Sequence, residues 1–301
     1  MKPADITNQR VLLSPLNWGM GHVSRCISLI DQLIAQGNTI FLAVDESQRF
    51  VLEQYFTHVT FIDHLGYPFE FGGKGYFGWD LTKRFSKLNQ RMREERAEVE
   101  SYVSTHKIDV VLSDHRYGFF SLQVPSIFIT HQYNLPSRWY EWSVASLHRR
   151  LMGLFSGVWV MDFEDARLAG KLSAGAKDKR ATYIGPYSRF SRYEPLEKSI
   201  EEVLILSGPD VYAKQLLERF SNNDSMLIIG NRNVVTNTQS SIAAGDWLAQ
   251  DRAILAAKKV ISYAGYSTIM DLNVLQAESS LIPTRGQREQ IYLAKRHGTS
   301  K

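Results

Sequence analysis

Short, uninterrupted apolar runs alternate with segments of helical periodicity from one end of the chain to the other. In the first half, the apolar runs occupy residues 11–13, 39–44, 59–62, 110–112, 127–130 and 158–161. Strands that read as continuous apolar runs are typical of parallel sheets, because helices cover both faces of such sheets. The alternation therefore predicts an α/β fold made of βα units around parallel strands.

A segment of weak periodicity, residues 171–200, interrupts this alternation and contains Gly185, Pro186 and Pro195. We interpret it as the connection between an N-terminal domain, residues 1–185, and a C-terminal domain, residues 200–301. The alternation then restarts. It predicts strands at residues 203–206, 226–229, 260–262 and 280–282, and helices at 247–257, 269–275 and 287–296.

Residues 64–80 break the pattern differently, because they are rich in glycine and aromatic side chains. Long loops in compact domains are often functional, so we expect a functional surface loop here. A charged helix is expected to follow over residues 81–105.

The composition is that of a soluble globular protein. The chain has 301 residues, of which 44% are hydrophobic and 22% charged, with a net charge of +4. This charge is too low for a dedicated nucleic-acid binder, and no apolar stretch is long enough to predict a membrane span. The single cysteine, Cys26, excludes an internal disulfide framework and favours the cytoplasm. Residues 83–96 and 147–155 combine basic and apolar side chains, so a peripheral membrane contact stays open beside the simpler interpretation as solvated or core helices.

The first candidate site is the turn between the first strand and the first helix, which contains Gly19, Gly21 and His22. Its glycines allow a close backbone approach to a ligand, and the helix N-terminus offers free N–H groups. His22 is a candidate base or donor near neutral pH. The simpler alternative is a tight turn capped by a histidine. Because Asp45 ends the second strand, a dinucleotide-binding turn of an oxidoreductase is a further alternative, although Ser24 replaces its third glycine.

Two more candidates follow later strands of the same half. Asp114 and His115 come after the strand at 110–112, and His131 follows the strand at 127–130. Ligands of open α/β sheets bind beyond the carboxyl ends of the strands. We therefore expect Asp114 and His131 to lie on the same rim as His22, as catalytic residues.

Three strand-to-helix turns of the second half are candidate ligand sites, since such turns bind phosphates and amide side chains suit sugar hydroxyls. Their candidate donor-binding residues are Ser207, Gly208, Ser262, Gly265, Ser267, Thr268, Asp271, Gln287 and Gln290. Each turn is also an ordinary helix start, and Thr268 with Asp271 has the spacing of a capping box. No cysteine and histidine cluster has metal-ligand spacing, so we expect no metal.

Taken in order, these motifs resemble those of family 28 glycosyltransferases, which include the bacterial N-acetylglucosaminyltransferase of peptidoglycan lipid synthesis. The segments VISYAGYSTIMDL and LIPTRGQREQIYLAKR resemble the donor-binding region of that family, and NWGMGHVSRC resembles its N-terminal glycine-rich turn. VLSDHRYG, FITHQYN and YIGPYSRF resemble a bacterial subgroup of glycosyltransferase-like proteins. The resemblance implies a GT-B architecture, with two Rossmann-like, doubly wound parallel-sheet domains facing a cleft.

The resemblance also implies roles for single residues. Gly21 and His22 would approach the reacting sugar and the acceptor, while Gly265, Ser267 and Thr268 would bind the diphosphate. Asp271 takes the place of a ribose-binding glutamate, and Gln290 matches a glutamine that reads the donor sugar. The implied reaction moves a hexose or hexosamine from a UDP-sugar, such as UDP-GlcNAc, to a hydroxyl acceptor of a glycolipid or cell-envelope glycan. The UDP-sugar is a co-substrate, and no cofactor is implied.

The sequence departs from the family pattern at several positions. Leu293 replaces an asparagine, and Tyr263 and Tyr266 make the phosphate turn bulkier. The chain ends at Lys301, soon after the last motif, where further helices would return to the first domain; this indicates either a minimal or a truncated form. A UDP-sugar epimerase or hydrolase, and a non-catalytic nucleotide-sugar-binding protein, therefore stay open as alternatives.

Overall fold

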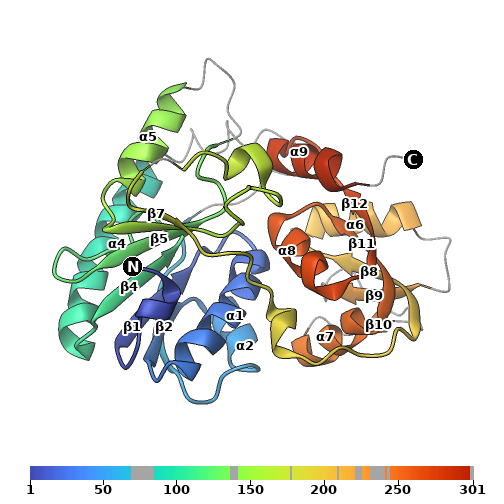
Figure 1. Ribbon diagram of the computed structural model, residues 1–301, viewed down its shortest axis with the longest axis horizontal. Helices are drawn as coiled ribbons and strands as arrows, with labels where there is room; N and C mark the ends of the chain where they lie inside the picture. Colours follow the sequence, from blue (N-terminus) through green and yellow to red (C-terminus); the bar gives the residue numbers. More distant parts are fainter. Residues whose placement is uncertain are drawn as a thin grey trace.

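The computed structural model describes residues 1–68, 85–135, 142–176, 178–208, 210–220, 226–230, 241–242 and 245–298. It consists of two α/β halves, each built on a parallel sheet, that lie side by side (Figure 1). Of the sequence-based expectations, residues 69–80 of the predicted loop, the first four residues of the helix predicted after it, and Pro209 lie outside the described residues.

The first half is a seven-stranded parallel sheet in the order β3-β2-β1-β4-β5-β6-β7. Its strands are β1 (Arg10–Pro15), β2 (Thr39–Val44), β3 (Thr60–Asp63), β4 (Val110–Asp114), β5 (Ser126–Thr130), β6 (Gly157–Val160) and β7 (Ala181–Tyr183). Its helices are η1 (Pro3–Asp5), α1 (Met20–Ala35), α2 (Glu46–Leu52), α4 (Phe85–His106), α5 (Trp142–Met152) and η3 (Gly170–Leu172). The central strands β1, β4 and β5 are buried along almost their whole length, as their apolar runs predict.

The second half is a five-stranded parallel sheet in the order β10-β9-β8-β11-β12. Its strands are β8 (Ile200–Leu206), β9 (Leu227–Gly230), β10 (Ser241–Ile242), β11 (Ala257–Tyr263) and β12 (Glu278–Ile282). Its helices are α6 (Asp210–Phe220), α7 (Trp247–Leu255), α8 (Tyr266–Leu275) and α9 (Arg288–His297). The predicted α/β class and the pair of parallel sheets are confirmed.

Two details differ from the prediction. The segment interpreted as the domain connection contains β7, a short half-buried strand that pairs with β6 at the edge of the first sheet. Helix α8 begins at Tyr266, three residues before its expected start at 269. The reason is that Ser267 and Thr268 are polar, so the apolar pattern used for the prediction sets in only at Ile269, whereas the helix begins directly after the N-cap Gly265.

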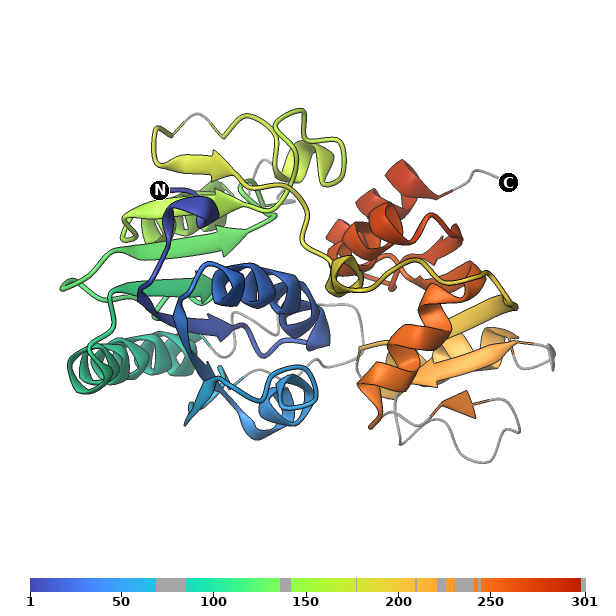
Figure 2. The ribbon, with the colours of Figure 1, turned by 60° about the horizontal axis from the view of Figure 1, so that its bottom comes forward.

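The connection between the halves runs from β7 to β8 and includes η4 (Arg189–Arg192), which packs against α1 and α8 (Figure 2). Apolar residues of α8 and α9, namely Tyr266, Ile269, Met270 and Leu293, join the same buried cluster as α1 and the strands of the first sheet. The largest apolar core therefore continues from one half into the other.

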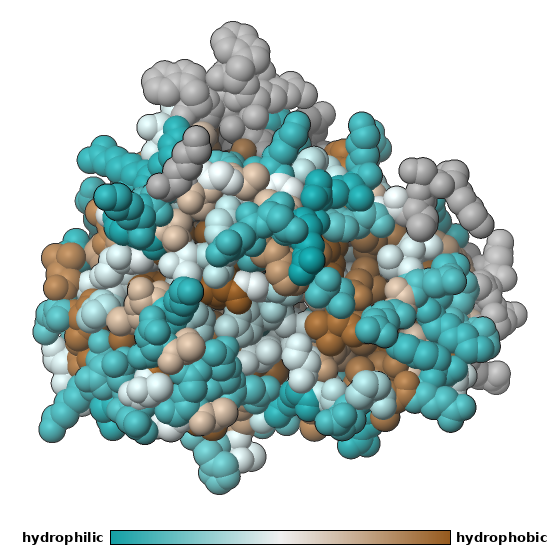
Figure 3. All heavy atoms as spheres, viewed as in Figure 1, coloured by the Kyte–Doolittle hydropathy of each residue, from teal (hydrophilic) through white to brown (hydrophobic). Residues whose placement is uncertain are grey.

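Hydrophilic residues are spread over the face seen in Figure 3, with hydrophobic patches between them.

Candidate active site

The first turn of α1 places His22 beyond the carboxyl ends of the strands of the first sheet. The N-cap Gly19 has φ of 130°, a conformation that side-chain-bearing residues rarely adopt. This glycine lets the chain turn from β1 directly into the helix. The side chain of His22 is 18% exposed, so the imidazole is largely buried but reachable.

Asp114 ends β4, the strand next to β1, and its carboxylate is fully buried beside His22. His22 Nδ1 lies 2.8 Å from Asp114 Oδ2, and the Arg25 guanidinium forms an ion pair with Oδ1. Burial alone raises the pKa of Asp114, but the neighbouring Arg25 and His22 hold this pKa well below its usual value. Asp114 is therefore an ionised carboxylate that accepts hydrogen bonds from both neighbours.

His22 is a neutral imidazole in this setting, because burial and the charge of Arg25 lower its pKa more than Asp114 raises it. The positive end of the helix dipole also favours the neutral form of a histidine, but burial is the main cause of the lowered pKa of His22. When Nδ1–H donates to Asp114, the lone pair of Nε2 is left to accept a proton. An imidazole held this way by a carboxylate has the arrangement of a general base.

His131, the third predicted catalytic residue, lies on the same rim but has both ring nitrogens engaged. Arg25 Nη1 lies 3.0 Å from His131 Nδ1, and Glu289 Oε1 of α9 lies 2.7 Å from Nε2. The ring also stacks on Tyr266, with centroids 4.3 Å apart and an angle of 4° between the planes. Neither nitrogen is free to take a proton from a substrate hydroxyl, so this conformation favours His22 as the base.

The N-terminus of α8 meets the first turn of α1. Ser267 Oγ donates to the backbone carbonyl of Gly21 over 2.8 Å, directly beside His22. The first-turn N–H groups of a helix have no partner within the helix, so this end of α8 can accept an anion. Gly265 and Thr268 are half-buried in the same turn, whereas Ser262 is fully buried with its hydroxyl on the Tyr263 carbonyl.

We expect Gly21→Ala to weaken ligand binding at this junction. A Cβ on residue 21 would lie 2.7 Å from Ser267 Oγ, closer than carbon and oxygen approach without bonding. Ser267 would have to rotate and give up its bond to the carbonyl of residue 21. The expected result is weaker binding of a diphosphate ligand with little loss of thermal stability, measured by calorimetry and by a melting curve. Asn273→Ala, at an exposed position of α8, is the control, and equal binding in both variants would contradict the proposed junction.

Asp271, the predicted ribose-binding residue, lies in α8 but is turned toward the connection between the halves. Ser188 Oγ donates to its Oδ1 over 2.6 Å, and Arg189 Nη1 lies 3.2 Å from its Oδ2. Both oxygens of this short, buried side chain are therefore occupied. In this conformation Asp271 ties α8 to the connection between the halves.

The other predicted donor-side residues are placed as follows. Gln287 is the N-cap of α9, and Gln290 one turn later accepts from the Thr284 hydroxyl at 2.7 Å through Oε1. Ser207 and Gly208 are exposed between β8 and α6. No described contact joins Ser207 or Gly208 to the His22 site.

Sequence reasoning missed Arg25 and Glu289, which connect the predicted residues to one another. Arg25 lies three residues after His22 on the same helix face, and this spacing was a usable signal. Glu289 immediately precedes the predicted Gln290. The structure also gives Asp45 a local structural role, because Oδ1 of its side chain caps α2 by accepting from Gln48 N at 2.9 Å.

Comparison with solved structures identifies the architecture. The chain is similar to the glycosyltransferase of kitacinnamycin, with 14% identity, a TM-score of 0.62, and coverage of 96% of this chain and 84% of that chain. It is also similar to Arabidopsis thaliana UGT89C1 complexed with UDP-L-rhamnose, with 15% identity, a TM-score of 0.59, and coverage of 95% and 82%. A third similar structure, Acinetobacter baumannii MurG, has 12% identity, a TM-score of 0.53, and coverage of 97% and 85%. The chain has the GT-B fold. No protein-family model matches the chain, and no curated protein matches its sequence.

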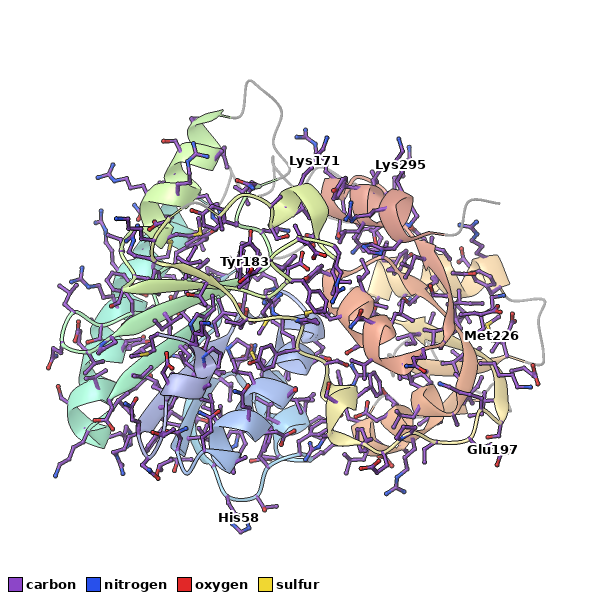
Figure 4. The ribbon with its side chains drawn as sticks, viewed as in Figure 1. His58, Lys171, Tyr183, Glu197, Met226 and Lys295 are labelled. Atoms are coloured by element: carbon purple, nitrogen blue, oxygen red, sulfur yellow. The ribbon has the colours of Figure 1, made fainter. Side chains whose placement is uncertain are left out.

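Helix α9 contacts the first half of the molecule. Tyr292 OH accepts from Lys171 N at 2.9 Å, and His297 Nε2 lies 2.6 Å from the Leu168 carbonyl. Figure 4 labels Lys171 and Lys295, which mark the two sides of this contact. Leu293 is fully buried in the shared apolar core, so leucine at this position fills a packing site.

None of the described helices is long and apolar enough to cross a membrane. Among the described residues, no group of three or more His, Cys, Asp or Glu side chains is arranged to hold a metal ion.

Proposed function

We propose that this GT-B protein transfers a sugar from a nucleotide-diphosphate sugar to a hydroxyl acceptor, with His22 as general base. One observation carries the proposal: the His22–Asp114 pair lies against the N-terminus of α8, through the bond from Ser267 to the Gly21 carbonyl. A base and an anion-binding helix end thus adjoin each other across the interface between the halves. Direct displacement of a nucleoside diphosphate by a hydroxyl group uses these two features side by side.

In the proposed reaction the acceptor oxygen attacks the anomeric carbon of the donor. The acceptor O–H proton moves to His22 Nε2, and Asp114 stabilises the imidazolium that forms. The bond between the anomeric carbon and the diphosphate oxygen breaks, and its electron pair leaves with the nucleoside diphosphate. The N–H groups at the start of α8 balance the charge of this leaving group in place of a metal ion.

The finer assignments are part of the same proposal. UDP is the favoured nucleotide, a hexose or hexosamine the favoured sugar, and a glycolipid or cell-envelope hydroxyl the favoured acceptor, by resemblance to family 28. A cytoplasmic enzyme with a peripheral membrane contact fits α5, where Val144 and Leu147 are 47% and 38% exposed beside Arg149 and Arg150. Titration with anionic vesicles tests the membrane contact separately.

The test of the donor site is calorimetric binding of UDP, GDP and NADH to the wild type and to Thr268→Asp. A carboxylate in the first turn of α8 stabilises the helix but repels a diphosphate, so UDP should bind at least about tenfold more weakly, with the fold intact. Asn273→Asp, an exposed position on the same helix, is the matched control and should bind UDP like the wild type. Binding of NADH in preference to UDP would contradict the proposal.

Turnover distinguishes the remaining alternatives. Release of UDP only when a hydroxyl acceptor is present supports a transferase. Conversion of UDP-sugar without an acceptor would indicate an epimerase or hydrolase instead, and UDP binding without any turnover would indicate a nucleotide-sugar-binding protein.

A further inference from the structure

A continuous chain of polar contacts runs from the second half of the molecule to His22. Glu289, in the first turn of α9, contacts His131 Nε2 through Oε1, and its Oε2 accepts from the Gln132 side chain. His131 Nδ1 contacts Arg25, and Arg25 contacts both Asp114 and His22. Among the residues of this series of contacts, Glu289 is the one that comes from the second half of the molecule.

The two partners of His131 fix the position of its proton. A guanidinium can only donate hydrogen bonds, so Arg25 makes Nδ1 of His131 an acceptor. The proton of the neutral ring is then on Nε2, where it is donated to the Glu289 carboxylate. A carboxylate that accepts from one ring nitrogen makes the other nitrogen a stronger hydrogen-bond acceptor. His131 with Glu289 as its partner therefore holds Arg25 more firmly than His131 without that partner would.

The position of Arg25 in turn decides the proton position on His22. Arg25 Nη2 lies 2.8 Å from His22 Nδ1, the same distance as Asp114 Oδ2. If Asp114 accepts from this nitrogen, Nε2 keeps a free lone pair and can act as a base. If Arg25 donates to it instead, the proton moves to Nε2 and the base is lost.

We propose that Glu289 is a positioning residue that keeps His22 in its base-competent tautomer, through His131 and Arg25. The inference rests on the proposed function, because it gives His22 the role of general base. It implies that the base is complete only when the second half is docked on the first. Tyr266, stacked on His131 from α8, adds a second contact across the same interface.

The charged and titratable groups around His22 come from several elements. Arg25 and Cys26 lie on α1, Asp114 and His115 at the end of β4, His131 after β5, and Glu289 on α9. Removing the negative charge of Glu289 leaves the positive charge of Arg25 less balanced. The pKa of His22, already lowered by burial, should then fall further.

The test reads the tautomer directly, by nitrogen NMR of histidine-labelled protein, with the His22 signal assigned from a His22→Gln variant. In the wild type we expect the Nδ1–H form of His22, and in Glu289→Ala a shift toward the Nε2–H form. Glu289→Gln keeps an acceptor for His131 but loses the charge, so it should largely restore the tautomer while the pKa of His22 stays lower. Glu278→Gln, an exposed acid on β12, is the control and should match the wild type.

Kinetics give the second readout. In Glu289→Ala, kcat should fall at least about tenfold, since general bases supply about 10²–10⁴-fold of rate, while UDP binding is unchanged. In Glu289→Gln, the acid limb of the pH–rate profile should move to lower pH. An unchanged His22 tautomer in Glu289→Ala would overturn the inference, as would an effect confined to the KM of the donor, which would make Glu289 a sugar contact. The NMR result stands even if the wild type transfers no sugar, so the two proposals fail separately.

Discussion

Alanine in place of His22 is expected to lower the rate of sugar transfer by about 10²–10⁴-fold while UDP binding stays close to that of the wild type. Of the His22–Asp114 pair, only the imidazole can be reached by a substrate, because the carboxylate of Asp114 is completely buried. The N-terminus of α8, which would hold the diphosphate, contacts the backbone of Gly21 and not the His22 ring. Catalysis and nucleotide binding should therefore separate in this variant.

The measurement pairs single-turnover rates with calorimetry on His22→Ala, Asp114→Asn and the control His58→Ala. His58 is exposed in a turn far from the dyad along the chain, and its loss should change neither quantity (Figure 4). Because the pKa of His22 is lowered by burial, the wild-type rate should fall only as the pH drops below the ordinary histidine value of 6.5, as the ring gains its proton. A wild-type rate in His22→Ala would remove this residue from the mechanism.

The sequence predicted the elements whose apolar residues are continuous. Strands β1, β4 and β5 are buried on both faces, so each appears in the sequence as a short continuous apolar run that can be recognised as a strand. Strand β7 escaped prediction because its residues are only half-buried and sit at a sheet edge. The start of α8 escaped prediction because the polar residues Ser267 and Thr268 interrupt the apolar pattern in its first turn.

The site was predictable as far as neighbouring strands dictate it. His22, Asp114 and His131 follow three adjacent parallel strands, β1, β4 and β5, so sheet topology alone brings them to one rim. The pairing of His131 with Glu289 was not predictable, because the two residues are 158 positions apart and meet through the docking of the two halves. Likewise, the sequence motif offered Asp271 to a ribose, whereas the folded connection supplies Ser188 and Arg189 as its partners.

Those partners lead to the second large effect, an expected loss of about 3–5 kcal/mol of folding free energy at neutral pH in Arg189→Met. The Arg189 guanidinium is buried, with Nε 2.5 Å from Asp251 Oδ1 and Nη1 3.2 Å from Asp271 Oδ2. Nη1 also donates to Ser24 Oγ on α1 over 2.7 Å. Removing one cation would leave two buried carboxylates facing each other at the joint between the halves.

The loss should shrink as the pH is lowered. Burial raises the pKa of Asp271 to about 6 even with Arg189 present, since the guanidinium and the Ser188 hydroxyl only partly offset it. A carboxyl with a raised pKa in the folded state binds its proton more tightly there than in the unfolded chain, so ionisation opposes folding above that pKa. Without Arg189 this pKa rises further. Protonation of Asp271 as the pH falls from 7 to 5 should therefore restore part of the lost stability.

Urea unfolding of Arg189→Met and Arg192→Met at pH 7 and pH 5 measures this effect. Arg192 lies on the same short helix, pairs with Asp31 at 3.6 Å and is 26% exposed. It also lies over the rings of Tyr55 and Phe56, which a methionine can still cover, so its replacement should cost clearly less than that of Arg189 at either pH. A large loss in Arg189→Met that is the same at both pH values would show that packing, and not the unpaired carboxylates, accounts for it. A loss no larger than that of Arg192→Met would mean that the ion pairs of Arg189 do not stabilise the joint between the halves.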